Sequence, residues 1–172
     1  MTQVPEEIKT LLSEMFNQSD RAAAVVAASV LDELLRKALL SFLLESSKAD
    51  ELLFGVYKPL SSLKAKTDVA LLLGLISPDE CADLNTIRQI RNDFAHKFDI
   101  LTFSTTGISL LCGKLNGFRK TNPPAGLTPT SADVFKFSVT VLAYRLHHLS
   151  VTLPRVSGYK SLSDAITQPN SG

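Results

Sequence analysis

The sequence predicts an all-α protein, folded as a compact helical bundle in a single domain. Its 172 residues are 45% hydrophobic, which is enough to bury one core. Apolar residues recur at spacings of three and four along several segments, and helix-capping and helix-breaking residues separate those segments. We expect residues 1–153 to form the domain. The polar residues after Pro154, 154–172, are expected to be a flexible C-terminal tail.

Two helices are predicted near the N-terminus. Residues 6–16 carry apolar side chains at helical spacing, which indicates a short amphipathic helix that covers the core. Residues 20–44 are expected to form the first core helix, with Asp20 as its N-cap. The apolar face of this helix is predicted to comprise Val26, Val30, Leu31, Leu34, Leu35, Ala38 and Phe42.

Two shorter helical segments follow in the sequence. Ser46 or Ser47 is expected to cap a short turn to Phe54, and Ser61 or Ser62 to start a helix that ends at Gly74. Gly74 suits the left-handed conformation that closes a helix. Lys64 and Lys66 in that helix are interpreted as a solvated face.

The strongest start signal lies at residues 77–80. Ser77 is suited to the N-cap position, Pro78 to the first helical position, and Glu80 to the third, where it completes a capping box. The helix that begins there is predicted to reach the region of His96. Its apolar side is expected to contain Cys81, Leu84, Ile87, Ile90 and Phe94.

The remaining chain is predicted to hold one more long helix. Residues 98–103 mix aromatic and β-branched side chains, which favours extended chain or a short β-ribbon, and a turn follows at 104–107. Residues 116–130 are rich in Gly and Pro and are expected to form a surface loop. The last helix runs to about Leu149, with core contacts from Val134, Phe137, Val141, Tyr144 and Leu149.

Candidate functional residues cluster at the end of the helix that begins at residue 78. Arg91, Asn92, Asp93 and His96 place a fixed cation, an amide, a carboxylate and a titratable imidazole within six residues. Arginine binds phosphate in a two-pronged geometry, and histidine transfers protons near neutral pH. Together these groups could support cleavage of RNA without a metal ion.

The helical spacing of Arg91 and His96 works against a site within one chain. Five residues turn an ideal helix by about 500°, so the two side chains point about 140° apart and are separated by about 7.5 Å along the axis. They can meet only if the helix unwinds before His96, or if two copies of the chain combine their motifs.

A purely structural role for these residues stays open beside the catalytic one. Asp93 and Lys97 are spaced for an ion pair, and Arg91 could pair with Asp20. His96 near the end of a helix is stabilised by the helix dipole.

The Arg-x4-His spacing with Asn directly after Arg resembles the signature of the HEPN superfamily of helical proteins. This resemblance implies a metal-independent endoribonuclease with Arg91 and His96 as catalytic residues and Asn92 as an orienting residue. HEPN sites are typically shared between two chains, so the resemblance also implies a homodimer, with RNA as the substrate.

The motif and the segments before it resemble the mannitol-operon repressor family. This resemblance rests on residues 59–68, 73–76, 83–84 and 87–96, and the two resemblances together cover Asp20 to Leu115. It implies a cytoplasmic bacterial regulatory protein that acts through a protein partner. The Asp20 segment matches the start of the first helix in that family, so Asp20 and Asp93 are expected to support the motif residues.

Composition argues against several functional classes. With 18 basic and 17 acidic residues, no global charge attracts nucleic acid. A helix that begins with Pro78, Asp79 and Glu80 is a poor recognition helix, so direct DNA binding is not expected.

The cysteines and the apolar segments give further exclusions. Cys81 and Cys112 lack the spacing of a zinc or disulfide framework, so no metal site and no cofactor are expected. The N-terminus lacks the pattern of a secretory signal, and charges interrupt the apolar segment 22–44. We therefore expect a cytoplasmic protein that does not enter the membrane.

Overall fold

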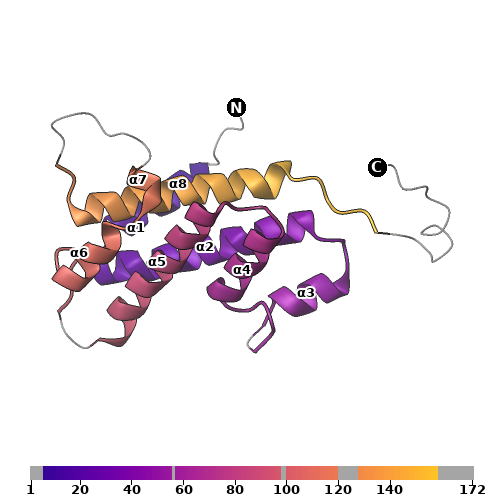
Figure 1. Cartoon of the computed structure of the whole chain (residues 1–172), viewed down its shortest axis with the longest axis horizontal. Helices are drawn as coiled ribbons and strands as arrows, with labels where there is room; N and C mark the ends of the chain where they lie inside the picture. The colour runs from indigo at the N-terminus through magenta and orange to yellow at the C-terminus, as the bar shows by residue number, and fades with distance from the viewer. Residues whose placement is uncertain (1–5, 56, 98–99, 120–127, 159–172) are drawn as a thin grey trace.

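The structure, a computed structural model, describes residues 6–55, 57–97, 100–119 and 128–158. Every regular element in these residues is a helix (Figure 1), which confirms the predicted all-α bundle. The helices are α1 (Glu6–Phe16), α2 (Asp20–Phe42), α3 (Ser47–Leu53), α4 (Leu63–Leu72), α5 (Pro78–His96), α6 (Thr106–Cys112), α7 (Asn116–Arg119) and α8 (Ser131–Thr152).

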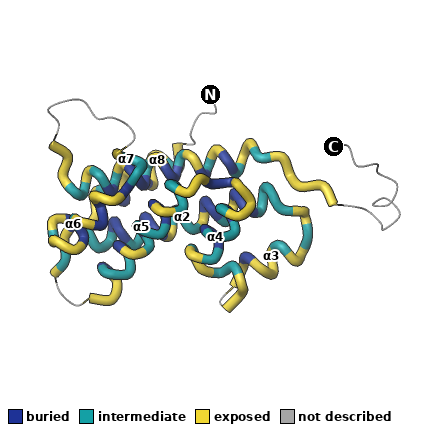
Figure 2. The backbone as a smooth tube through the Cα atoms, viewed as in Figure 1, coloured by how far each residue is buried: buried dark blue, intermediate teal, exposed yellow. Residues whose placement is uncertain are grey.

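Helix α2 is the centre of the bundle. It contacts α1, α3, α4, α5 and α8, and α8 lies alongside it over much of the long axis (Figure 1). Small side chains let neighbouring helix backbones approach closely, and buried leucines fill the remaining space. The small buried residues of α2 are Ala23, Ala24, Ala27, Ala28 and Ala38. Figure 2 shows the buried residues on the inner sides of the helices.

The start of α2 differs from the prediction by one residue. Ser19 is the N-cap, because its side chain accepts a hydrogen bond from the Ala22 N–H at 3.3 Å. Asp20 stands at the first helical position, and its Oδ2 accepts a hydrogen bond from the Phe103 N–H at 2.8 Å. The predicted cap at Asp20 is therefore wrong, and this carboxylate instead fixes the segment that follows α5.

The predicted start and stop residues of α4 are confirmed, although the helix itself is limited to Leu63–Leu72. Ser62 caps it, and Gly74 closes it with a φ of 70° in the left-handed region. The interpretation of a solvated lysine face holds for Lys64, whose side chain is 49% exposed. It is wrong for Lys66, which is 2% exposed, because α4 packs against both α2 and α5.

Helix α5 has the predicted capping box. Ser77 accepts a hydrogen bond from the Glu80 N–H, and the Glu80 carboxylate accepts one from the Ser77 N–H. Its buried side also contains Asp83, which binds Asn116 and Gly117 and so attaches α7. The predicted loop over 116–130 is therefore wrong for its first four residues, and residues 120–127 lie outside the described residues.

No β-ribbon forms in the described residues that follow α5. Residues 98 and 99 of the expected ribbon lie outside them, and residues 100–103 are not in a strand. The Phe103 ring packs between Phe94 and Phe135, with centroid distances of 5.3 and 4.7 Å. Its N–H binds Asp20 instead of a neighbouring strand. Aromatic anchoring thus replaces strand pairing, and α6 follows where only a turn was predicted.

Helix α8 is three residues longer than predicted and buries a different face. Phe137 and Val141, expected in the core, are each 38% exposed, whereas Leu149 is buried as expected. The buried residues are Phe135, Ser138, Val139, Leu142, Ala143, Leu146 and Leu149. This stretch is apolar on most sides, so periodicity alone left the buried face undefined.

Residues beyond α8 reach back to the end of α2. Arg155 forms an ion pair with Glu45 at 2.6 Å, and the Val156 N–H donates to the Phe42 carbonyl at 2.8 Å. Residues 159–172 lie outside the described residues. The division into a domain and a flexible tail stays a prediction.

Candidate functional site

A cleft of about 520 Å³ opens between α2, the start of α4 and α5. Helix α5 contributes two arginines and an amide, and the opposite walls contribute hydroxyl, carboxylate and ammonium groups. The lining residues are Ala28, Ser29, Asp32 and Glu33 from α2, Ser61, Ser62, Leu63 and Lys64 from the start of α4, and Arg88, Arg91 and Asn92 from α5.

The wall formed by α5 carries two guanidinium groups. One face of the helix carries Arg88, Arg91 and Asn92, because Arg91 and Asn92 follow Arg88 by three and four residues. Arg91 Nη1 donates a hydrogen bond to Asn92 Oδ1 at 3.0 Å, which orients the guanidinium. Arg88 Nε is buried and has no hydrogen-bond partner within the described part of the chain. In that part, neither arginine has a carboxylate partner within ion-pair distance.

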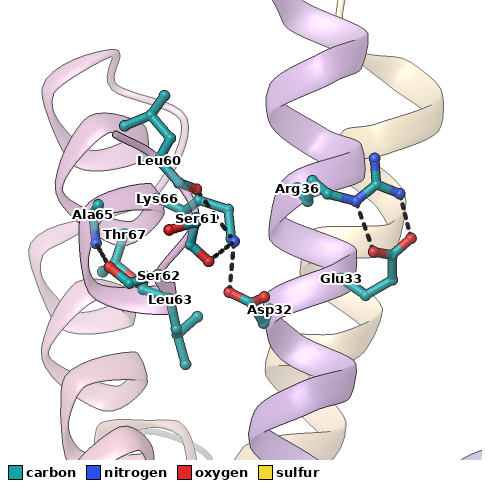
Figure 3. Close-up of polar contacts among 10 residues, drawn as sticks. All are labelled: Asp32, Glu33, Arg36, Leu60, Ser61, Ser62, Leu63, Ala65, Lys66 and Thr67. Atoms are coloured by element: carbon teal, nitrogen blue, oxygen red, sulfur yellow. Dashed lines mark hydrogen bonds and ion pairs between the residues drawn. The ribbon is translucent and has the colours of Figure 1, made fainter. Parts of the chain in front are cut away.

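A buried lysine ties the opposite walls together (Figure 3). Lys66 Nζ lies 2.9 Å from Asp32 Oδ1 on α2 and donates to the Ser61 carbonyl at 3.1 Å. A longer contact of 3.4 Å reaches the Leu60 carbonyl. The buried ammonium therefore has a carboxylate and backbone acceptors around it, as a charge removed from water requires. It also fixes the segment before α4 against α2.

The other charges at the cleft are matched. Arg36 Nε donates to Glu33 Oε2 at 2.7 Å, and a second bond joins Arg36 Nη2 to Glu33 Oε1. This bidentate bond holds the pKa of the Glu33 carboxyl below its usual value, so Glu33 is ionised at neutral pH. Lys64 pairs with Asp68 at 2.6 Å on the solvent side.

The structure brings Arg91 and Asn92 together in this cleft but does not bring His96 to them. Helix α5 is continuous through His96, which is exposed and does not line the cleft. The helix therefore does not unwind before His96, which was one of the two ways in which Arg91 and His96 could meet. A catalytic role for Arg91, Asn92 and His96 stays a prediction.

The two carboxylates expected to support the motif have other partners. Asp93 forms the expected ion pair with Lys97 at 3.1 Å. The predicted alternative pair between Arg91 and Asp20 is not formed, because Asp20 binds the Phe103 N–H. Arg21 donates to the Lys97 carbonyl at 3.0 Å. The start of α2 thus fixes the backbone after α5 and not the side chain of Arg91.

Sequence reasoning missed three residues of this region: Arg88, Asp32 and Lys66. The spacing of Arg88 from Arg91 and Asn92 was a usable signal, since residues three and four apart face the same way. The pairing of Lys66 with Asp32 had no signal, because it joins two helices distant in sequence.

A second groove, of about 470 Å³, is mostly apolar and lies along α1 and α2. Its polar edge includes Lys37 and His147. The apolar residues that line it are Ile8, Leu11, Val25, Val26, Val30 and Leu34.

The described residues offer neither a metal site nor a membrane-spanning helix. They contain no group of three or more His, Cys, Asp or Glu side chains placed to hold a metal ion. None of their helices is both long enough and apolar enough to cross a membrane.

This chain is similar to a known protein in its fold. No family model matches the sequence, and no curated protein matches it. The fold is similar to that of a chain in the X-ray structure of the MtlR–HPr complex from Escherichia coli. The TM-score is 0.63 at 17% sequence identity, and the match covers 80% of this chain and 99% of that chain.

The likeness to MtlR agrees with the resemblance to mannitol-operon repressors at the level of the fold. The comparisons give no support to the HEPN resemblance.

Proposed function

We propose that this chain is a cytoplasmic regulatory protein that acts by binding a partner protein. The observation that carries the proposal is the fold shared with almost the entire MtlR chain, which was solved in complex with HPr. HPr is therefore the first partner to test. The sequence resemblance to mannitol-operon repressors, which rests on residues 59–68, 73–76, 83–84 and 87–96, supports the same function.

The surroundings of α5 argue against direct binding to DNA. A recognition helix contacts bases with residues near its N-terminus. The first turn of α5 contains Asp79 and Glu80, and Glu80 forms an ion pair with Arg145 of α8 at 3.1 Å. Asp83, one turn later, is buried under α7. This end of α5 is acidic and partly covered by α7 and α8, which disfavours insertion into a DNA groove.

Isothermal titration of the chain with purified HPr tests the proposal. We expect saturable binding with one HPr bound per chain, and no binding of an operator-length DNA duplex at physiological salt. The salt concentration is specified because contacts between a protein and DNA phosphates weaken steeply as it rises. Absence of binding to HPr would reject HPr as the partner. Tight and sequence-specific binding to the duplex by the chain alone would reject action through a protein partner.

Metal-independent RNA cleavage is the alternative function. The exposure of His96 at the end of α5 favours it, since an exposed imidazole could meet Arg91 of a second copy. Because the helix is continuous, this function needs a homodimer. Light scattering coupled to size exclusion measures the mass directly. A purely monomeric mass at micromolar concentration would remove the composite site.

A further inference from the structure

The cleft between α2, α4 and α5 has positive charge that the described residues do not neutralise. Its two carboxylates, Asp32 and Glu33, are each engaged by a basic side chain outside the α5 wall. Lys64 is engaged by Asp68. The two guanidinium groups of α5 are left without a carboxylate, and both face the same cavity.

Arg91 has a fixed orientation, and Arg88 has a donor that no described residue uses. Asn92 orients Arg91, whereas the buried Arg88 Nε has no acceptor in the described part of the chain. Nearly all buried donors in native proteins have an acceptor, so a buried donor without one calls for an explanation. An oxyanion in the cleft would supply the acceptor, and guanidinium groups match phosphate and carboxylate geometry well.

The start of α4 adds donors on the opposite side. Leu63 and Lys64 line the cleft and belong to the first helical turn, whose N–H groups have no carbonyl of their own helix to bind. The Ser62 hydroxyl accepts a hydrogen bond from the Ala65 N–H, which leaves its own proton able to donate into the cleft. The volume of about 520 Å³ lies in the range of small-molecule sites.

We propose that this cleft binds a small ligand through an oxyanion group, a phosphate monoester or a carboxylate, held between Arg88 and Arg91 of α5 and the first turn of α4. The ion pair of Lys66 with Asp32 fixes the start of α4 against α2 in the absence of the ligand. This site is independent of the proposed binding of HPr, so either can fail alone.

The Nε–Hε signal of Arg88 in a ¹H–¹⁵N NMR spectrum tests the proposal at the group that lacks an acceptor. The probes are inorganic phosphate and, in a separate titration, acetate, both at constant ionic strength set with sodium chloride. The proteins are wild type, Arg88→Met, Arg91→Met, and Arg119→Met as the control. Arg119 is an exposed arginine of α7 that does not line the cleft, so its loss changes the net charge equally.

We expect a saturable shift of the Arg88 signal in wild type and in Arg119→Met. In Arg91→Met the affinity should fall by roughly tenfold or more, because a charge-assisted hydrogen bond is lost. Saturation by phosphate alone would indicate a phosphate monoester as the ligand group, and saturation by acetate alone a carboxylate. Arg88 shifts that are linear, or equal in wild type, Arg91→Met and Arg119→Met, would overturn the proposal and indicate an adventitious ion only.

Arg88→Lys is a second variant, which tests the site if Arg88→Met does not fold. If Arg88→Met does not fold, Arg88→Lys keeps the charge but removes the fork that binds an oxyanion in two places. Binding followed at the Arg91 signal should then weaken relative to wild type. Unchanged affinity in Arg88→Lys and Arg91→Met together would overturn the assignment of the site to these arginines.

Discussion

Replacement of Lys66 by Met tests how the walls of the cleft are held together. The substitution keeps most of the aliphatic stem in a position that is 2% exposed, and it removes the ammonium group. Asp32 then loses its partner at 2.9 Å, and the Ser61 carbonyl loses its donor at 3.1 Å. The free energy of unfolding should therefore fall substantially.

The size of the loss depends on how far each partner is buried. Breaking a buried ion pair typically costs about 3–5 kcal/mol, because the remaining charge is left in a medium of low polarity. Asp32 is 33% exposed, so water can solvate part of its charge once Lys66 is gone. We therefore expect a loss of about 2–3 kcal/mol for Lys66→Met.

Urea unfolding at neutral pH measures this loss, and Lys64→Met is the matched control. Lys64 stands two residues away on the same helix and pairs with Asp68, but both side chains are about half exposed. Its replacement should cost no more than about 1 kcal/mol. In a double-mutant cycle, Lys66→Met and Asp32→Asn should be coupled by about 1–3 kcal/mol. Equal losses for the two lysine variants, or no coupling, would refute the assigned role of Lys66.

Asp83→Ala should lower the free energy of unfolding by about 3–4 kcal/mol, since it removes the acceptor of three hydrogen bonds from Asn116 and Gly117. Asp83→Asn should lower it less in the same urea assay. A loss below about 1 kcal/mol for Asp83→Ala would contradict the attachment of α7 by Asp83. Burial raises the pKa of the Cys112 thiol to about 12. At pH 8 iodoacetamide should therefore modify Cys81 in the folded protein and Cys112 only after unfolding. Equal rates of alkylation of the two cysteines in the folded protein, measured by mass spectrometry, would contradict this burial. If Arg91 and His96 are catalytic, Arg91→Ala and His96→Ala should each slow chelator-resistant cleavage of single-stranded RNA by about 10²–10⁴-fold with little change in melting temperature; no cleavage by wild type across a varied RNA pool would reject the nuclease alternative.

Local signals in the sequence predicted most of the helices. The capping box at Ser77 and the left-handed Gly74 are properties of a few adjacent residues, and both were confirmed. The conformation of residues 100–103 depends on contacts with residues distant in sequence. These are the packing of the Phe103 ring on Phe135 and the hydrogen bond from the Phe103 N–H to Asp20. β-Branched and aromatic residues therefore indicated a ribbon where tertiary contacts give an anchored turn.

The candidate site was predicted only in part. The motif drew attention to Arg91 and Asn92, which do meet in the cleft. The opposite wall comes from α2 and α4, and no local pattern shows that Lys66 is buried against Asp32. A lysine next to a capped helix start is usually solvated, so only the packing of α4 between α2 and α5 could reveal the exception.

Sedimentation velocity of the chain mixed with an equimolar amount of HPr tests the central claim most directly, with a parallel cell that contains an operator-length DNA duplex at physiological salt. Binding of a partner protein predicts one faster boundary that contains both proteins in the first cell. In the second cell the chain should sediment as it does alone. An unchanged boundary with HPr, together with co-sedimentation with the duplex, would contradict the proposed action through a protein partner.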